Sequence, residues 1–301
     1  MTEEEFILAD RIQKIKSVNE QYNLYENSWI SFSGGKDSSV VNYLIDLALP
    51  NNKIPRVYIN TGIDYKKTVR FVEKLQEKDH RIIIMRPIEN VKDTLNNYGY
   101  PFKSKEHSRK IKDFNRGLSN QSLLRYSWKI KDEDYERQRR FACPKKLMYQ
   151  FEEKDKYNYS DECCIRLKER LFRIAEKKFG KEIAITGMRK KEGGRRNRIN
   201  CMNPTATKFS PLAPVTDEWE SWFIKEMKVE LNPLYNEPFN FDRTGCIGCP
   251  FAINIDHELR TLKKYDMAEF KRAWNIFGYV YKEYRRIDYR LTKESEIDDE
   301  L

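Results

Sequence analysis

The sequence predicts an α/β fold in which a parallel sheet carries helices on both faces. Short apolar runs at residues 29–32, 57–59 and 82–85 have the length of buried strands. Helical patterns separate these runs, as expected when parallel strands are joined by crossover helices. A chain of 301 residues with 18 Tyr, 16 Phe and 5 Trp is large enough to bury such a core.

The remaining elements follow in order along the chain. We expect an amphipathic helix over residues 4–25 before the first strand, a helix through 40–47 after it, and a helix over about 64–78 before the third. A helix over about 162–179 then leads to a fourth strand at 183–186, and a passage marked by prolines is expected to be irregular. Asp217 is the predicted N-cap of a helix that Pro233 ends, and a final helical segment covers about 256–286.

We predict two domains along this chain. Residues 1–215 form the α/β domain, and residues 216–301 form a helical C-terminal segment. The stretch from about residue 100 to residue 150 is long, polar and basic, and we expect it to form a helical insertion that interrupts the sheet.

The charge is positive and unevenly distributed. Lys and Arg number 57 against 47 Asp and Glu, and the whole excess lies in residues 103–146 and 166–198. Such blocks attract polyanions, either nucleotides or nucleic acid. The first block also contains aromatic residues that could stack on bases, although a solvated helical surface with a buried stripe explains them as well. These aromatic residues are Phe114, Tyr126, Trp128, Tyr135 and Phe141.

Two further observations concern location. No stretch approaches the roughly 18 apolar residues that a membrane-spanning helix needs. The acidic residues 1–5 lack the basic and apolar regions of a secretion signal. We therefore expect a cytoplasmic protein with no membrane partner.

A glycine-rich loop joins the first strand to the following helix. Its sequence is Ser33, Gly34, Gly35, Lys36, Asp37, Ser38 and Ser39. The glycines allow a sharp turn that brings backbone N–H groups close to an anion. The start of the helix adds N–H donors and a positive dipole end, and Lys36 adds a charge. This is not the Walker pattern, but it predicts a phosphate-binding loop.

Six cysteines suggest metal or redox chemistry, because disulfides are rare in cytosolic proteins. Cys246 and Cys249 form a Cys-x-x-Cys, a spacing that lets two thiolates reach one metal centre. Cys163 and Cys164 are adjacent at a predicted helix start, where the helix dipole favours the thiolate. Four such ligands suit a [4Fe–4S] cluster or a tetrahedral zinc ion. The other two, Cys143 and Cys201, are expected to be small buried side chains.

Residues 33–39 resemble the Ser-Gly-Gly-x-Asp-Ser signature of the PP-loop superfamily, whose fold is adenine nucleotide alpha-hydrolase-like. The tripeptide 60–62, Asn-Thr-Gly, resembles the Asp-Thr-Gly of its phosphoadenosine-phosphosulfate (PAPS) reductase branch, with Asn in place of Asp. Residues 186–196 resemble the Gly-x-Arg…Glu…Arg segment of that branch. The Cys-Cys…Cys-x-x-Cys pattern is similar to the one that holds a [4Fe–4S] cluster in bacterial sulfonucleotide reductases.

The resemblance implies roles for particular residues. It implies nucleotide binding by the loop together with Thr61, Gly62, Gly187, Arg189, Glu192 and Arg196. It implies catalytic roles for Lys36, Asp37, Arg189 and Arg196, in which the arginines hold the sulfate or leaving group as bidentate donors. It implies cluster ligation by Cys163, Cys164, Cys246 and Cys249.

The implied function is that of a PAPS-reductase-family enzyme that binds ATP or a sulfonucleotide beside a [4Fe–4S] cluster, with zinc as the alternative metal and Mg²⁺ as a further candidate. Sulfur transfer or nucleotide cleavage is expected. Conventional sulfate assimilation is not, because that route uses a cysteine on a C-terminal tail and none follows Cys249.

Two alternatives stay open. One is an ATP pyrophosphatase in tRNA or DNA thiolation, with a strand bound across residues 103–146. The other is a non-catalytic accessory protein or sensor that binds nucleotide and cluster. An electron-donor or sulfur-donor protein is an expected partner.

Overall fold

The structure is a computed structural model that describes residues 1–129, 142–192 and 198–292. It divides into two compact units, each made of two stretches of chain. The sheet unit comprises Met1–Pro87 and Glu169–Gly245, and the cysteine unit comprises Ile88–Lys168 and Cys246–Leu301. The chain changes unit three times, after Pro87, Lys168 and Gly245, and none of these points is the boundary expected near residue 215. The basic insertion and the Cys-x-x-Cys belong to the same unit.

The sheet unit contains a five-stranded parallel sheet, as the sequence predicts. Its strand order is β3-β2-β1-β4-β5. Ile30 pairs with Arg56 on one side and with Ile185 on the other. The strands are β1 (Ser28–Ser31), β2 (Arg56–Ile59), β3 (Ile82–Met85), β4 (Ile183–Ile185) and β5 (Lys208–Phe209). Only β5 lies where an irregular passage was expected.

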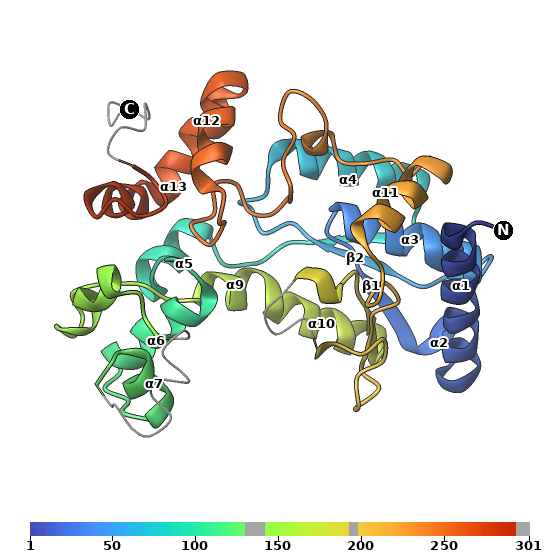
Figure 1. Cartoon of the computed structure of the whole chain (residues 1–301), viewed down its shortest axis with the longest axis horizontal. Helices are drawn as coiled ribbons and strands as arrows, with labels where there is room; N and C mark the ends of the chain where they lie inside the picture. Colours follow the sequence, from blue (N-terminus) through green and yellow to red (C-terminus); the bar gives the residue numbers. More distant parts are fainter. Residues whose placement is uncertain (130–141, 193–197, 293–301) are drawn as a thin grey trace. The chain divides into compact units, whose positions relative to one another are not determined.

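Helices cover both faces of this sheet (Figure 1). On one face α1, α3 and α11 pack together over Ile30 and Phe209. On the other face α10 packs through Leu171 against Trp29 and Val57. The helices and short helical turns of this unit are α1 (Glu3–Tyr22), α2 (Leu24–Asn27), α3 (Lys36–Ala48), α4 (Lys66–Lys78), α10 (Arg170–Phe179), η4 (Lys190–Glu192), α11 (Asp217–Glu226) and η6 (Pro233–Tyr235).

The cysteine unit is helical throughout its described elements. They are α5 (Val91–Tyr98), α6 (Lys105–Asn115), α7 (Gln121–Tyr126), η2 (Lys145–Phe151), α9 (Glu162–Cys164), the π-helical turn η3 (Ile165–Glu169), α12 (Ile255–Tyr265) and α13 (Met267–Arg286). The predicted basic helical insertion corresponds to α6, α7 and η2. Residues 130–141 of that prediction lie outside the described part of the chain.

Several predicted boundaries were wrong, and local chemistry explains them. Thr216, not Asp217, caps α11, because its hydroxyl accepts from the Trp219 backbone N–H. That helix ends at Glu226, well before Pro233. The first predicted helix is broken by Asn23, which adopts a left-handed φ of 48°. Among the described residues, no helix has both the length and the apolar sequence needed to cross a bilayer.

Candidate nucleotide site and cysteine group

The strand order creates a switch point at the carboxyl edge of β1. The chain passes from β1 to β2 and β3 in one direction, whereas β4 lies on the opposite side of β1. Loops that leave neighbouring strands in opposite directions open a crevice, where α/β folds bind ligands. The loop 33–39 follows β1 and the segment 186–189 follows β4. The fold therefore brings these two candidate segments together.

The glycine loop is shaped by its own serines. Gly34 has a left-handed φ of 68°, which favours glycine. The Ser38 hydroxyl accepts from the Ser33 backbone N–H at 3.2 Å and donates to the Gly35 carbonyl at 2.8 Å. The Ser33 hydroxyl accepts from the Gly35 N–H at 3.2 Å. Gly35 is then the N-cap of α3 without a side-chain cap, although the Lys36 N–H already donates to the Tyr235 hydroxyl at 3.0 Å. The positive dipole end of α3 and the later N–H groups of its first turn are what this helix start offers an anion.

Gly187 allows the β4 loop to approach this helix start closely. A Cβ atom at Gly187 would lie 2.9 Å from both the carbonyl carbon and the Cβ of Asp37. Such contacts are shorter than real carbon atoms tolerate. We infer that glycine at this position sets the distance between the two loops.

Arg189 is held beside the loop by three carboxylates. Its Nε donates to Asp37 Oδ1 at 2.6 Å and one terminal nitrogen donates to Asp217 Oδ1 at 2.7 Å. The other terminal nitrogen lies 3.2 Å from Glu220 Oε2. Only 6% of Arg189 is exposed, so this side chain is an integral part of the site and not a surface charge. Although burial opposes its charge, the carboxylates raise the pKa of Arg189.

Glu220 is a buried carboxylate that the sequence prediction missed as a site residue. Lys36 Nζ lies 3.3 Å from its Oε2, yet neither carboxylate oxygen receives a hydrogen bond from the described residues. Burial and the nearby charge of Asp37 raise the pKa of Glu220 to about 7. Its position next to Trp219 and three residues before Phe223, on the buried face of α11, is the sequence signal that could have identified it.

The turn after β2 lies at the same carboxyl edge of the sheet. Gly62 has a positive φ of 85°. Both the backbone N–H and the hydroxyl of Thr61 donate to Asp64 Oδ2 at 2.7 Å. Position 60 carries Asn where the PAPS reductase signature has Asp, and Asp64 supplies a carboxylate to this turn instead.

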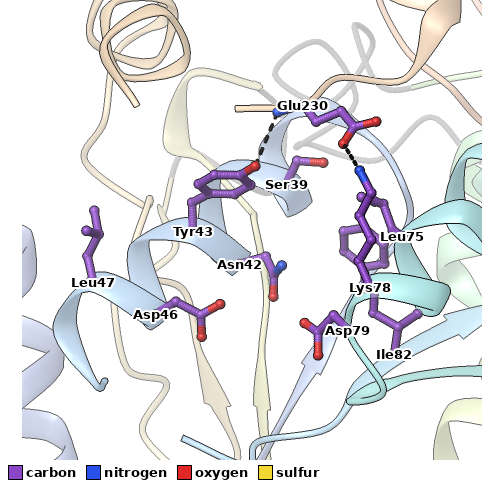
Figure 2. Close-up of a pocket in the computed structure, with 11 residues that line it drawn as sticks. Ser39, Asn42, Tyr43, Asp46, Leu47, Leu75, Lys78, Asp79, Ile82 and Glu230 are labelled. Atoms are coloured by element: carbon purple, nitrogen blue, oxygen red, sulfur yellow. Dashed lines mark hydrogen bonds and ion pairs between the residues drawn. The ribbon is translucent and has the colours of Figure 1, made fainter. Parts of the chain in front are cut away.

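Three residues predicted to bind the nucleotide are not placed at the junction described above. The backbone of Glu192 lies in η4, whereas Arg196 lies outside the described residues. Ser39 lies in α3, where its hydroxyl lines a separate cavity between α3 and α4 (Figure 2).

The cysteine unit brings all four predicted ligand cysteines within electrostatic reach of one another. Cys163 is buried, and Cys164, Cys246 and Cys249 are half-buried. A hydrogen bond with Cys164, burial, and the charges of Cys164, Cys249 and Cys246 raise the pKa of Cys163 well above its usual range. The thiolate-favouring effect expected at a helix start is therefore outweighed. Within the described residues, no three His, Cys, Asp or Glu side chains are arranged to bind a single metal ion.

The Cys-x-x-Cys loop is fixed by α13. The Tyr281 hydroxyl donates to the Gly248 carbonyl, and the Tyr284 hydroxyl donates to the Pro250 carbonyl at 2.9 Å. Arg290 also donates to the Pro250 carbonyl, at 2.7 Å. Gly248 has a φ of 54°, and a Cβ there would meet the Tyr281 hydroxyl and Ala273. These contacts leave one backbone path for the loop between Cys246 and Cys249.

The other two cysteines have distinct surroundings. Cys143 is fully buried, as expected, with its sulfur 3.9 Å from His107 Nδ1. Burial raises the pKa of Cys143 to about 12, so it remains a thiol. Cys201 is half-buried and accepts from an Arg11 terminal nitrogen at 3.4 Å.

The proposed stack of aromatic residues in the basic insertion is contradicted for two of its members. Phe114 is 9% exposed and Tyr126 is 6% exposed. Both rings pack against Phe151 inside the cysteine unit. They belong to the buried stripe, because apolar rings on short amphipathic helices are drawn into the core. Tyr135 and Phe141 lie outside the described residues.

Two curated relatives are uncharacterized proteins of Methanocaldococcus jannaschii. One is 23% identical over 290 residues, covering 90% of this chain and 55% of the relative. The other is 24% identical over 260 residues, covering 85% of this chain and 41% of the relative. The chain thus spans about half the length of the curated relatives it matches.

Three similar solved structures are more distant in sequence. The PAPS reductase of Candida auris, in a phosphate complex, has a TM-score of 0.43 and 13% identity, covering 82% of this chain and 96% of its own. The NH3-dependent NAD synthetase of Campylobacter jejuni has a TM-score of 0.41 and 13% identity, with coverages of 95% and 96%. The U34-tRNA thiolase NcsA of Methanococcus maripaludis, with its [4Fe-4S] cluster, has a TM-score of 0.38 and 12% identity, with coverages of 99% and 82%.

The family assignment rests on a broader match. The sequence profile of the phosphoadenosine phosphosulfate reductase domain matches residues 27–252. This range includes the glycine loop, the Arg189 segment and all four candidate ligand cysteines. The chain therefore belongs to the phosphoadenosine phosphosulfate reductase domain family.

Proposed function

We propose that this chain is an enzyme that binds an adenine nucleotide at the loop 33–39 and carries a [4Fe–4S] cluster on Cys163, Cys164, Cys246 and Cys249. Its reaction is a sulfur transfer or the cleavage of ATP or a sulfonucleotide. The observation that carries the proposal is the junction of the glycine loop with Gly187 and Arg189 at the switch point of the sheet.

The nucleotide part of the proposal is supported by the local geometry. The uncapped start of α3 offers backbone N–H groups and a positive dipole end to a phosphate. Lys36 and Arg189 lie beside it, each positioned by a carboxylate. Arg189 has five N–H donors in total, and a guanidinium is suited to bidentate binding of phosphate or sulfate oxygens. Thr61 and Gly62 approach the same edge from β2.

The cluster part is supported by the chemistry of the four cysteines. Their mutual interaction makes ionisation unfavourable unless a positive centre compensates for it. A single zinc ion requires four sulfurs that converge on one point. A [4Fe–4S] cluster also takes four thiolates, one at each iron, placed around a larger centre. When bound, the cluster would supply electron transfer or a charged centre.

The chain's own residues have defined roles in this proposal. Lys36 and the start of α3 bind the phosphates, and Arg189 orients the sulfate or leaving group. Asp37 and Asp217 keep the guanidinium of Arg189 in place. Glu220 has a pKa near 7, so it can hold or release a proton next to Lys36 at neutral pH.

Calorimetric titration with ATP and with PAPS tests the nucleotide site. We expect Lys36→Ala to weaken binding at least about tenfold, because a charged contact to phosphate is lost. The matched control is Lys53→Ala, an exposed lysine of the same unit, which should leave the affinity unchanged. Equal affinities for the two variants would show that the loop does not bind the phosphates.

Anaerobic iron analysis tests the cluster. We expect about four irons per chain, lost in Cys246→Ser and retained in Cys201→Ser. About one zinc and no iron would contradict the cluster and favour a structural metal. Sulfite release with a reductant would identify sulfonucleotide reduction, whereas pyrophosphate release would identify ATP cleavage. Nucleotide binding without turnover would identify the accessory or sensor role.

Thiolation of nucleic acid remains the second candidate function. The observation in its favour is the basic charge of residues 103–146 and 166–198. The burial of Phe114 and Tyr126 removes part of the stacking surface expected for it. Pyrophosphate release that rises when tRNA or DNA is added would establish this candidate, and a rate independent of both would exclude it.

A further inference from the structure

A second cavity lies in the sheet unit, between α3 and α4. Its volume is about 490 Å³, which is within the range of small-molecule sites. α3 contributes one wall and α4 the other, while Glu230 approaches from the segment that follows α11 (Figure 2). The lining includes Phe32 and, from the glycine loop 33–39, only Ser39. This cavity is therefore distinct from the proposed phosphate site.

Ser39 gives the cavity an unsatisfied polar group. Its side chain is 3% exposed, and its hydroxyl has no hydrogen-bond partner among the described residues. A buried hydroxyl without a partner is unfavourable, and native proteins rarely leave one unexplained. Because this hydroxyl is closed to solvent, a ligand in the cavity becomes its partner only when the Ser39 side chain rotates toward the cavity.

Two neighbours of Ser39 on α3 present hydrogen-bond donors. The Asn42 side-chain oxygen accepts from Arg56 Nε at 2.6 Å, so the group that Asn42 can offer a ligand is its NH2. The Tyr43 hydroxyl accepts from the Glu230 backbone N–H at 3.4 Å, so its hydrogen can point elsewhere. Ser39, Asn42 and Tyr43 thus suit a ligand with carbonyl or ring-nitrogen acceptors.

Carboxylates line the ends of the same cavity. Asp46 and Asp79 lie at one end, where Arg81 binds both carboxylates. Arg81 does not itself line the cavity, so a ligand faces carboxylate oxygens. At the other end Glu230 is paired with Lys78 at 3.3 Å. Carboxylates accept hydrogen bonds from hydroxyl or amino groups but have no donor for a phosphate. Lys78, which pairs with Glu230, is the one cation among the described lining residues of this cavity.

We propose that the cavity between α3 and α4 binds a neutral nucleoside. Leu47 and Leu75 provide most of the apolar surface for a flat ring, because Phe32 and Ile82, which also line the cavity, are only 1% and 2% exposed. The donors of α3 match acceptors on the base, and the terminal carboxylates match sugar hydroxyls or an exocyclic amine. This site lies beyond the proposed function, because it is separate from residues 33–38 of the phosphate loop and its acidic end, Asp46 and Asp79, offers acceptors and no donors to a ligand.

Titration of the full-length protein with the four ribonucleosides and their 5′-monophosphates tests the proposal. We expect one nucleoside to bind more tightly than its monophosphate. Asn42→Asp should weaken that binding at least about tenfold, because it keeps the Arg56 contact but replaces the NH2 donor by an acceptor. Asn19→Asp is the matched control, because the Asn19 side-chain oxygen also accepts a hydrogen bond. Leu75→Trp should fill the cavity and abolish binding.

The variant Lys36→Ala distinguishes nucleoside binding in the cavity from binding at the loop 33–39. Nucleoside binding that survives Lys36→Ala and is lost in Asn42→Asp supports the proposal. The opposite pattern assigns the binding to the loop and overturns it. It is also overturned if no nucleoside binds at roughly 1 mM, or if the monophosphate binds as tightly as the nucleoside. ATP binding to the unmodified protein reports on the proposed function independently.

Discussion

Gly187→Ala is the sharpest test of the junction between the β4 loop and α3. The added methyl group would lie 2.9 Å from the carbonyl carbon and Cβ of Asp37 and 3.0 Å from its carbonyl oxygen. Carbon atoms pack best from about 3.5 Å, so the two segments must separate by roughly 0.6 Å. Two of the three contacts are backbone atoms, which cannot rotate away. We expect the free energy of unfolding to fall by about 1–3 kcal/mol.

The same displacement should weaken nucleotide binding. Asp37 holds Arg189 through a 2.6 Å hydrogen bond, and moving either residue disturbs the position of the guanidinium. Misplacement of binding groups by about 1 Å can cost as much as 100-fold in rate, so we expect at least about a tenfold loss of ATP affinity. Urea unfolding followed by circular dichroism measures stability, and calorimetric titration measures affinity.

Gly245→Ala is the matched control for this change. A Cβ at Gly245 meets no atom within 4 Å, so the expected change in stability is within about 0.5 kcal/mol. Equal stability of the two variants would refute the close approach at Gly187. A destabilised Gly187→Ala protein with unchanged ATP affinity would show that the junction is structural and lies outside the nucleotide site.

Two further variants test buried polar groups. Burial and Asp37 raise the pKa of Glu220 from 4.5 to about 7; between these pH values only the folded protein keeps the proton, so the free energy of unfolding should fall as pH rises. The total fall is up to about 3 kcal/mol, and Glu220→Gln should remove it. Urea unfolding at pH 5, 6 and 7 measures this, and an unchanged pH dependence in the variant would mean that other groups cause it. Tyr284→Phe should cost about 1–3 kcal/mol, because the hydroxyl binds the Pro250 carbonyl and the Lys103 N–H. The exposed Tyr265→Phe should change stability by less than about 0.5 kcal/mol, and equal effects would contradict the role of Tyr284.

The sequence predicted the sheet well because its first three strands contain short runs of apolar residues. Runs such as 82–85 are apolar throughout, which distinguishes them from the amphipathic helices between them. The strand β5 has two residues, Lys208 and Phe209, too few for any pattern to emerge. The helix α5 (Val91–Tyr98) was not predicted, because four of its eight residues, Asp93, Thr94, Asn96 and Asn97, have low helix propensity. The unit boundaries could not be predicted, because each unit joins distant stretches of chain.

The candidate site was predictable only where one short segment carries the chemistry. Residues 33–39 form a loop by their own glycines and serines, and so the sequence indicates them directly. Glu220 and Asp217 approach Arg189 from α11, and nothing in their local sequence states which residue they will meet. Tyr235, whose hydroxyl accepts from the Lys36 backbone N–H at 3.0 Å, is equally distant in sequence. Contacts between residues that are far apart in the sequence depend on tertiary packing, so only the structure identifies them.

The net charge of +10 on the whole chain does not describe the glycine loop, where each cationic side chain named in the site is paired with a carboxylate. Lys36 is paired with Glu220, and Arg189 is paired with Asp37, Asp217 and Glu220. The site is thus close to balanced, and its attraction for a phosphate depends on the open start of α3 and on the backbone of the loop. The carboxylates hold the two cations in position, so that a phosphate meets a prepared arrangement of donors instead of a general positive field.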